Sequence, residues 1–422
     1  MAQYNTTSTA DGILKEIYAD GIVNLLPESA VLTKLIPFNS AKKIGKTYNQ
    51  PVRLTGEHGI TFSSSGVATL NTAVAQTIGN AAVPAFELFL RSQLSYDLVM
   101  QADSDRKSFE NVADLLVTGM LEDATRYTEI ELLYGGDGIG TTSSSANTNA
   151  TTTVATFTTA SWADGIWSGM EGQVIEFYDS TNTIVSSGAN ADFIVSAVNP
   201  DSRTVTFTGT AAGITALDTA IAAGACDAYF NGSNGNEMSG LKAILTNTGT
   251  LFGLSATTYS LWRGNTYSAS SAALNFGKLN SAISRAVARG LNEAACLIVN
   301  PKTWHNLNSN EAALRMYDSS YKKTVAENGV EKLSYHGSNG VVEVYPHNIC
   351  KEGDAFLFPK KKIQRIGSQD WAFMPADGDN ERLLWNVPDV TAYELRVATG
   401  QSLFLETPAR GVYVNEIVNT NS

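Results

Sequence analysis

The sequence predicts an α+β fold that carries a β-rich region near its middle. Three observations support this prediction. Residues 105–134 have the apolar periodicity of one long helix, residues 154–230 contain short alternating strands, and residues 237–350 mix helical and strand patterns. Together they indicate a chain of several structural regions.

The composition narrows the class of protein. The chain has 422 residues, of which 43% are hydrophobic and 17% are charged, enough for one large domain or two to three ordinary ones. A net charge of -12 disfavours a dedicated duplex-DNA binder, and no apolar run is long enough to span a membrane. Uncharged polar residues are abundant, and a low-charge surface suits a protein that packs against its own copies.

The cysteines and the N-terminal residues indicate a reducing compartment. Cys226, Cys296 and Cys350 cannot form a disulfide framework, and their odd number points to free thiols. Residues 1–7 lack a basic segment followed by an apolar one, so we expect no secretory signal.

The first elements along the chain are short. Helical apolar spacing predicts an amphipathic helix over residues 11–26 that ends at Pro27, and a second apolar stretch, residues 30–36, ends at Pro37. Because neither is long enough to form a domain, we expect both to lie on another part of the protein.

Residues 47–90 predict extended structure. Apolar and polar residues alternate at 52–54 and 60–62, and residues 63–66, with the sequence Ser-Ser-Ser-Gly, form a flexible tip. A two-stranded arm has little apolar surface of its own to bury. We therefore predict a long β-hairpin that leaves the body of the protein.

The clearest element is the helix over residues 105–134, of roughly eight turns. Residues 103–105 supply capping candidates, and Gly135 and Gly136 end the helix. We expect this helix to run as a spine across one domain.

The β-rich region follows a low-complexity run. Residues 141–153 are almost entirely Thr, Ser, Asn and Ala, which predicts a linker, and residues 231–236 predict an exit linker. Between them, a small β-barrel or sandwich is predicted from the strand candidates 174–178, 183–185, 193–198 and 204–207.

The remaining chain predicts mixed structure. A helix is expected to start near Ser271, residues 296–299 form a buried strand, and Pro301 opens a short helix that ends at Leu307. Residues 308–340 are polar and predict loops. Further strand candidates are 341–345, 355–358, 403–405 and 411–418.

No group of residues predicts catalysis, a cofactor or a metal. The glycines at 135, 136, 138 and 140 end a helix, whereas a phosphate-binding loop opens one. Residues 377–381 resemble a fragment of a calcium loop, but the distal glutamate is absent, and a polar turn is favoured.

The four histidines, His58, His305, His336 and His347, lie far apart in the sequence. His347 and Cys350 have the spacing of half a metal site, but no second half is present. A strand end with a hydrogen-bonded imidazole is the favoured interpretation for His347.

The order of elements resembles the major capsid proteins of tailed bacteriophages with the Hong Kong 97-type fold. Residues 45–83 resemble the extended loop of that family, and residues 85–134 resemble the entry to its peripheral domain and its spine helix. Asn300–Trp304 is similar to the strand-to-helix step of the axial domain, and the stretch from Gly340 to Phe358 is similar to the strand pair that follows.

The resemblance implies a Hong Kong 97-like capsid fold with an N-terminal arm, an extended β-hairpin loop, a peripheral domain, an axial domain and a small all-β insertion domain. The boundaries expected from it are 1–44 for the arm, 45–84 for the loop, 85–150 for the peripheral domain, 151–235 for the insertion, 236–370 for the axial domain and 371–422 for a return to the peripheral domain.

The resemblance also implies a function. It is that of a structural, non-enzymatic subunit of an icosahedral shell that encloses phage double-stranded DNA, located in the virion and assembled in the host cytoplasm. The implied partners are copies of the same chain in hexamers and pentamers, a portal, possible decoration proteins and non-specifically contacted DNA, with no membrane.

Two departures from the family qualify that expectation. The type member cross-links its subunits through a lysine in the extended loop, and no lysine lies between Lys46 and Lys107, so this cross-link is not expected. The arm follows Met1 directly, with no long helical segment ahead of it, which implies a separate scaffolding protein or none.

Contact candidates follow from the same resemblance. The extended loop would supply Arg53, Glu57, His58 and Phe62 to contacts between subunits. The only dense basic run, Lys360, Lys361 and Lys362, is a further candidate, although such a run is more often a solvated strand or loop edge.

Other functions stay open at this stage. An encapsulin-like compartment would have the same fold around a cargo enzyme, although a β-insertion is less expected there. A surface adhesin or carbohydrate-binding β-protein would explain the Thr, Ser and Asn content but not the long helix or the missing signal.

Overall fold

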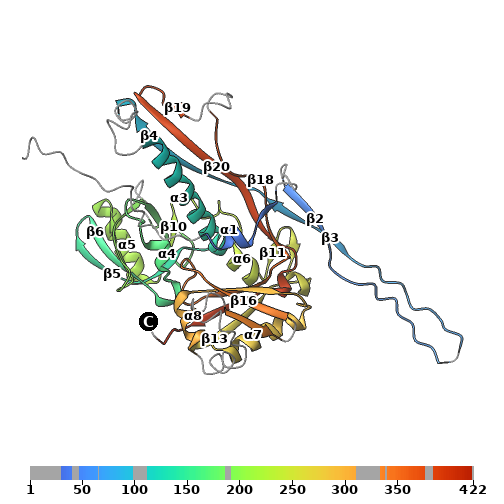
Figure 1. The fold of residues 1–422 in the computed structure, drawn as a ribbon. Coiled ribbons are helices and arrows are strands. Elements are labelled where there is room, and N and C mark those ends of the chain that lie inside the picture. Colours follow the sequence, from blue (N-terminus) through green and yellow to red (C-terminus); the bar gives the residue numbers. More distant parts are fainter. Residues whose placement is uncertain are drawn as a thin grey trace, which may run out of the picture.

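The computed structural model describes residues 30–39, 47–64, 66–97, 112–185, 192–309, 333–337, 340–375 and 384–420. The predicted helix at 11–26 and the acidic turn at 377–381 lie outside these ranges. Figure 1 shows a body built from a sheet backed by a long helix, a barrel and a second sheet, with one thin hairpin leaving it.

The hairpin is formed by β2 (Thr47–Arg53) and β3 (Ile78–Pro84), which pair antiparallel along their whole length. Beyond the paired strands, the described residues between 54 and 77 have no regular secondary structure and run away from the body (Figure 1). The prediction of a long hairpin that leaves the body is confirmed.

The first sheet follows the hairpin directly. Its edge strand β4 (Phe86–Ser95) pairs along its full length with β20 (Ala392–Leu405), and α3 (Val112–Tyr134) packs against both strands. The remaining strands of this sheet are β18 (Ile363–Phe373), β19 (Leu384–Asn386) and, parallel to β18, β1 (Phe38–Asn39).

The long helix α3 ends where the sequence predicts. Gly136 has a φ of +77°, the left-handed conformation that terminates helices and that glycine adopts without strain. Residues 105–111 of the predicted helix lie outside the described ranges. The apolar stretch at 30–36 forms the one-turn helix α1 (Leu32–Leu35), which packs on α3.

A closed barrel follows α3, with the strand order β10-β5-β6-β9-β8-β7. Its aromatic interior includes Phe157 at 4.5 Å from Trp167 and Phe177 at 5.1 Å from Phe207, between ring centroids. The strands are β5 (Gly140–Asn149), β6 (Thr152–Phe157), β7 (Val174–Tyr178), β8 (Phe193–Asn199), β9 (Thr204–Thr208) and β10 (Asp227–Phe230).

The predicted linker at 141–153 is wrong, because these residues form β5 and β6 and pair with each other. Threonine favours strands, and the inward positions Thr142, Thr153 and Ala155 are fully buried although they are small or polar. Low sequence complexity therefore concealed two strands. The predicted strand at 183–185 is reduced to a single bridge at Ile184.

The region is also not all β. Helix α5 (Ala211–Ala223) covers the barrel and contacts β5 and β6, and the one-turn helix α4 (Asp164–Trp167) lies between β6 and β7. The Thr210 hydroxyl caps α5 by accepting a hydrogen bond of 3.1 Å from the Gly213 N–H. The helix is rich in alanine, which has the highest helix propensity.

The second sheet has the order β13-β21-β17-β14-β16-β15. Its centre is as predicted, because β14 is completely buried and Pro301 opens the helix after it. The strands are β13 (Asn265–Ala272), β14 (Ala295–Val299), β15 (Leu333–Gly337), β16 (Gly340–Pro346), β17 (Ala355–Pro359) and β21 (Val412–Ile417), and the helices near them are α6 (Leu241–Thr246), α7 (Phe276–Ala288) and α8 (Pro301–Asn308).

Three predictions for this region are wrong in detail. Helix α7 does not start near Ser271, because β13 extends to Ala272 and the Asn275 side chain caps the helix at the Lys278 N–H, 2.9 Å away. The stretch predicted to be loop-rich, 308–340, contains the strand β15 among its described residues. Residues 371–422 do not all return to the first sheet, because β21 lies in the second.

Small elements complete the described chain. A short pair, β11 (Thr250–Leu251) and β12 (Leu254–Ser255), lies beside the hairpin base and contacts β3. The 3-10 turns are η2 (Thr159–Ser161), η3 (Ser260–Trp262) and η5 (Pro408–Arg410). In the described part of the chain, no helix is both long and apolar enough to cross a membrane.

Candidate functional site

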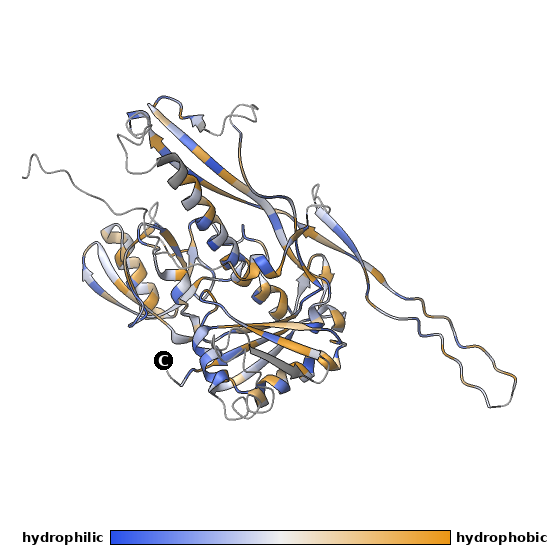
Figure 2. Cartoon of the chain, in the orientation of Figure 1, coloured by the Kyte–Doolittle hydropathy of each residue, from blue (hydrophilic) through white to orange (hydrophobic). Residues whose placement is uncertain are grey.

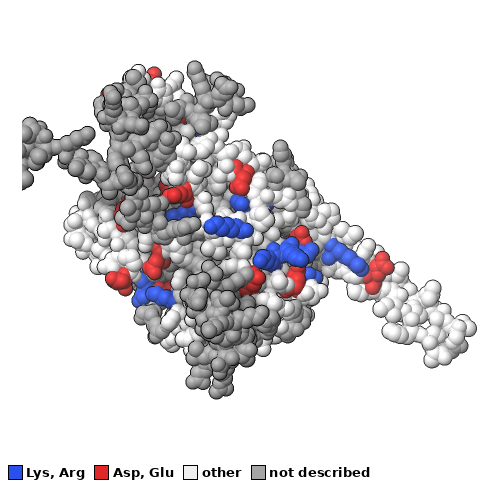
Figure 3. Space-filling view, in the orientation of Figure 1, with Lys and Arg blue, Asp and Glu red and all other residues white. Residues whose placement is uncertain are grey.

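The outer part of the hairpin exposes large apolar side chains. Phe62 is 91% exposed, Val67 85% and Leu70 81%. No Asp, Glu, Lys or Arg lies between Glu57 and Glu87, so the tip is uncharged, as Figure 3 shows, and Figure 2 shows hydrophobic residues along it. Exposed apolar side chains gathered on one uncharged segment are typical of interaction surfaces, and a contact made by this segment stays a prediction.

The hairpin places its four predicted contact residues one after another. Arg53 ends β2, and its Nε donates to the Thr55 carbonyl at 3.4 Å. Glu57 and His58 are exposed just beyond it, and Phe62 lies farther out. They do not converge on one point, and a contact with another subunit stays a prediction for each of them.

The basic run lies on the turn after β17. Lys360 forms an ion pair with Glu343 and Lys362 with Glu406, each at 3.1 Å, and Lys361 is exposed. The hydrogen bond to Glu343 raises the pKa of Lys360. Figure 3 shows Lys and Arg side chains gathered on the body near the origin of the hairpin. A role between subunits stays a prediction here too.

A buried carboxylate holds the described start of the chain to the body. Glu129, on α3, accepts hydrogen bonds from the Leu32 N–H at 2.9 Å, and from the Thr33 N–H at 2.6 Å and hydroxyl at 2.7 Å. His347 supplies the fourth bond, 2.7 Å long. The predicted metal half-site is thus a hydrogen-bonded imidazole at the end of β16, as the favoured interpretation states.

Arg126, also on α3, connects the helix to the barrel. Its buried guanidinium donates to the carbonyl oxygens of Gly165 at 3.2 and 3.1 Å, Ile166 at 3.0 Å and Ser168 at 2.5 Å. Main-chain bonds join the same faces, including Gly353 N–H to the Ala160 carbonyl at 3.0 Å. The barrel is therefore held against α3 and the turn before β17.

A buried charge cluster lies beyond the end of α3. The Lys351 ammonium donates to the Gly138 carbonyl at 2.5 Å, lies 4.0 Å from the centre of the Tyr134 ring, and is 3.8 Å from an Asp137 oxygen. Burial lowers the pKa of Lys351 to about 8. Asp354 accepts a bond of 2.7 Å from the Tyr413 hydroxyl, and burial raises its pKa.

The two connections between barrel and body run side by side. The Gly240 N–H donates to the Gly135 carbonyl at 2.8 Å, and the Gly136 N–H donates to the Glu237 carboxylate at 2.8 Å. A methyl group at Gly240 would lie 2.6 Å from the Gly135 nitrogen, so only glycine permits this approach. The chain thus enters and leaves the barrel at one place.

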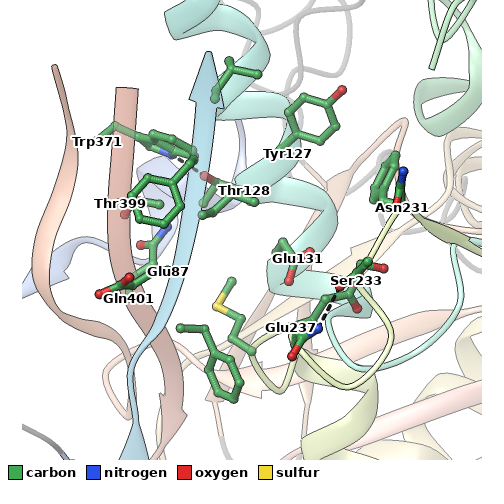
Figure 4. Close-up of a pocket in the computed structure, with 18 of the residues that line it drawn as sticks. Glu87, Tyr127, Thr128, Glu131, Asn231, Ser233, Glu237, Trp371, Thr399 and Gln401 are labelled. Carbon is green, nitrogen blue, oxygen red and sulfur yellow. Dashed lines mark hydrogen bonds between the residues drawn. The ribbon is translucent and has the colours of Figure 1, made fainter. Parts of the chain in front are cut away.

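Next to this junction is a cavity of about 320 Å³ (Figure 4). Strand β4, helix α3 and the segment that leaves the barrel line it, together with Trp371. Its walls mix aromatic and aliphatic side chains with polar ones, and Glu131 and Glu237 line the end nearest the junction. No cluster of three or more His, Cys, Asp or Glu side chains suited to a metal occurs among the described residues.

Sequence patterns did not single out the two buried polar residues of α3, Arg126 and Glu129. Arg126 and Glu129 are 6% and 0% exposed, yet they lie in the helical segment between the apolar positions 124 and 130. The one available signal was their spacing of three, which places both on neighbouring turns of one helix. Their partners are backbone groups distant in sequence, which no local pattern reveals.

Comparison with known proteins gives no match by sequence and clear matches by fold. The sequence matches no family model and no curated protein at a significant level. The chain is similar over 98% of its length, with a TM-score of 0.60 and 10% identity, to the capsid asymmetric unit of cyanophage A-1(L), of which the match covers 99%.

The chain has the Hong Kong 97-like capsid fold. Capsids of a native GTA particle and of cyanophage P-SCSP1u match at TM-scores of 0.51 and 0.50, each with 9% identity. The matches cover 99% and 100% of this chain, and 100% and 97% of the other chains. The assignment of α3 as the spine helix and of β2–β3 as the extended loop stays a prediction.

Proposed function

We propose that this chain is a major capsid protein, the repeated subunit of an icosahedral phage shell that encloses double-stranded DNA. One observation of the molecule itself supports this most strongly. The hairpin carries an uncharged tip with Phe62 and Leu70 exposed, which a lone chain leaves in water. The capsid fold supplies the context in which such a tip has a partner.

The partner of the hairpin is a second copy of the chain. Seven residue pairs join β2 to β3, and a two-stranded ribbon of this kind gains stability by lying on another surface. A head-to-tail contact repeated around an axis closes a ring, so hexamers and pentamers follow from one type of contact. Arg53, Glu57 and His58 would then flank the contact, each contributing modestly.

The other partners are inferred from the same role. A net charge of -12 suits a shell wall that contacts packaged DNA only non-specifically, with Lys360, Lys361 and Lys362 as a local exception. A separate scaffolding protein, a portal and decoration proteins complete the proposed particle. The proposed location is the virion, after assembly in the host cytoplasm, and we expect no enzymatic activity.

The barrel is proposed to be an insertion domain of this shell protein. The paired strands move its start from the expected residue 151 to Gly140, and its end stays near 235. Its adjacent connections at Gly135 and Gly240 support this assignment, because an inserted domain needs its two ends close together.

Electron microscopy of the purified chain, alone and with co-expressed phage proteins, tests the function. We expect closed shells tens of nanometres across. Replacing residues 59–73 by Asn-Gly shortens the hairpin at a place where the His58 N–H already bonds the Val74 carbonyl at 3.1 Å. This variant should fold and stay unassembled.

The same experiment separates the alternatives. Shells filled with DNA in native particles support a phage capsid, and shells filled with an enzyme support an encapsulin-like compartment. A chain that stays monomeric under all assembly conditions contradicts both and would favour an adhesin or another binding protein.

A further inference from the structure

The second sheet has an open edge at β13. Strand β13 pairs on one side with β21, and no described strand pairs with its other side. The Asn265 N–H donates to the Gly411 carbonyl beside β21, so the backbone groups of the next residue, Thr266, point to the free side. An open edge of this kind is a template on which a strand of another molecule can pair.

Two arginines of α7 occupy the start of this edge. Helix α7 lies beside β13 (Figure 1). The Arg285 Nη1 atom donates to the Thr266 carbonyl at 2.5 Å, and the Arg289 Nη1 atom donates to the Arg263 and Gly264 carbonyls at 3.2 and 3.4 Å. Because the two arginines are four residues apart, their side chains lie on the same side of the helix. Neighbouring turns of α7 thus supply cations to the carbonyls of the free edge.

The far end of β13 is covered in two ways. From the first turn of α7, the Lys278 ammonium donates to the Ala269 carbonyl at 2.7 Å. The strand is also bulged here, because its register with β21 shifts and Ser270 and Ser271 have φ of +58° and +50°. A bulge turns an edge away from the flat geometry that pairing with another strand requires.

The packing of α7 holds these cations in place. Its apolar side, with Leu279 and Ile283, is buried in the core of the second sheet. The Arg285 guanidinium also lies 5.1 Å from the centre of the Tyr267 ring on β13, which fixes it over the strand. Lys278, Arg285 and Arg289, the basic cluster, are therefore bound to the edge and are not freely solvated charges.

We propose that the basic cluster blocks the edge of β13 against pairing with the same edge of a second copy of the chain. Two such edges related by a two-fold axis would pair antiparallel and form a closed dimer. The cluster opposes this dimer, because pairing must first displace charge-assisted hydrogen bonds from the carbonyls that the second strand needs. The block acts within one chain and does not depend on the proposed function.

Sedimentation equilibrium of the full-length chain tests the proposal with the variant K278M/R285M/R289M. Methionine keeps an aliphatic side chain but donates no hydrogen bond, so the edge carbonyls become available. We expect the dissociation constant of the dimer to fall at least about tenfold relative to the wild type. The substitutions make the net charge of -12 more negative, and general electrostatic repulsion would therefore act in the opposite direction.

Hydrogen–deuterium exchange shows whether the association uses this edge. The Thr266 N–H is on the free side of β13, so it should gain protection only when a second strand pairs there. We expect its protection to rise with protein concentration in the triple variant and to stay low in the wild type. Association through the hairpin leaves this amide unpaired, so the two kinds of contact are distinguished.

A control variant and two contrary outcomes complete the test. K34M/R91M removes two exposed cations elsewhere on the chain and should associate like the wild type. A triple variant with the wild-type dissociation constant overturns the proposal, and so does a dimer that leaves the Thr266 amide unprotected. If the triple variant does not fold, R285M/R289M takes its place with the same two readings, because both arginines are exposed.

Discussion

The His347 Nε2 atom and the Glu129 Oε2 atom lie 2.7 Å apart, and neither side chain has any exposed surface. The Ile349 N–H donates to the other ring nitrogen, Nδ1, at 3.0 Å, so Nε2 carries the imidazole hydrogen and donates it in a hydrogen bond to Glu129 Oε2. One buried carboxylate thus joins the start of the described chain, the long helix and the end of β16.

This relationship predicts a large loss of stability for E129Q. The amide nitrogen of glutamine would face N–H or O–H donors in place of an oxygen, and in either orientation at least one N–H would lose its acceptor. We expect the free energy of unfolding to fall by about 2–4 kcal/mol. Denaturant unfolding measures this, with the exposed residue Glu122 as the control in E122Q. Equal unfolding midpoints for E129Q and the wild type would contradict the assignment.

The hairpin predicts a variant that folds but does not assemble. Phe62 and Leu70 are exposed in the single chain, so the double change F62S/L70S should alter the unfolding free energy by no more than about 0.5 kcal/mol. Shell formation should be lost, as measured by sedimentation and electron microscopy. I194S changes an exposed apolar residue of the barrel and serves as the control. Normal shells from the double variant would rule out this surface as a contact.

The hydrogen bonds of Arg126 predict that removing its guanidinium weakens the contact between the barrel and α3. R126M leaves three backbone carbonyls without their donor, which should weaken the contact by about 2–4 kcal/mol. Limited proteolysis should then cut the connections near residues 231–236 faster than in the wild type. R91M is the control, because the Arg91 side chain is 70% exposed. Unchanged cleavage rates would show that the guanidinium does not hold the barrel.

The lowered pKa of Lys351 predicts that the free energy of unfolding changes with pH in one direction. Its pKa is lowered to about 8 in the folded protein and is about 10.4 in an unfolded chain, so between these values the unfolded state binds more protons. Stability from this group therefore rises with pH across that window, with a slope of at most about 1.4 kcal/mol per pH unit.

Comparison with K351M isolates this contribution from the tyrosines and cysteines that titrate nearby. The unfolding midpoint of the wild type, relative to K351M, should increase from pH 7.5 to 10. A difference that stays constant would mean that the ammonium keeps an ordinary pKa when buried.

The sequence predicted the parts of the fold that depend on local periodicity. The apolar spacing before Tyr134, the glycine stop at Gly135 and Gly136, and the continuous run 296–299 each carry their information within a few residues. The hairpin was predicted for the opposite reason, because its residues lack a core pattern. These elements, in their order, were sufficient to predict the capsid fold.

What could not be predicted depends on partners distant in the sequence. Thr142 and Thr153 are buried only because a barrel closes around them, and their composition alone is typical of a linker. Glu129 is buried because Leu32, Thr33 and His347 meet it from segments about 97 and 218 residues away. Glu131 and Glu237 line the same cavity only because the barrel returns the chain to the place where it left.

That return has a consequence for how such a protein can change over time. Since the Gly240 N–H donates to the Gly135 carbonyl at 2.8 Å, the backbone leaves the body and re-enters it at one place. A different module with adjoining termini could replace the barrel without shifting the register of either sheet. At this junction, recombination could give chains of this fold new surfaces while the framework of the two sheets stays the same.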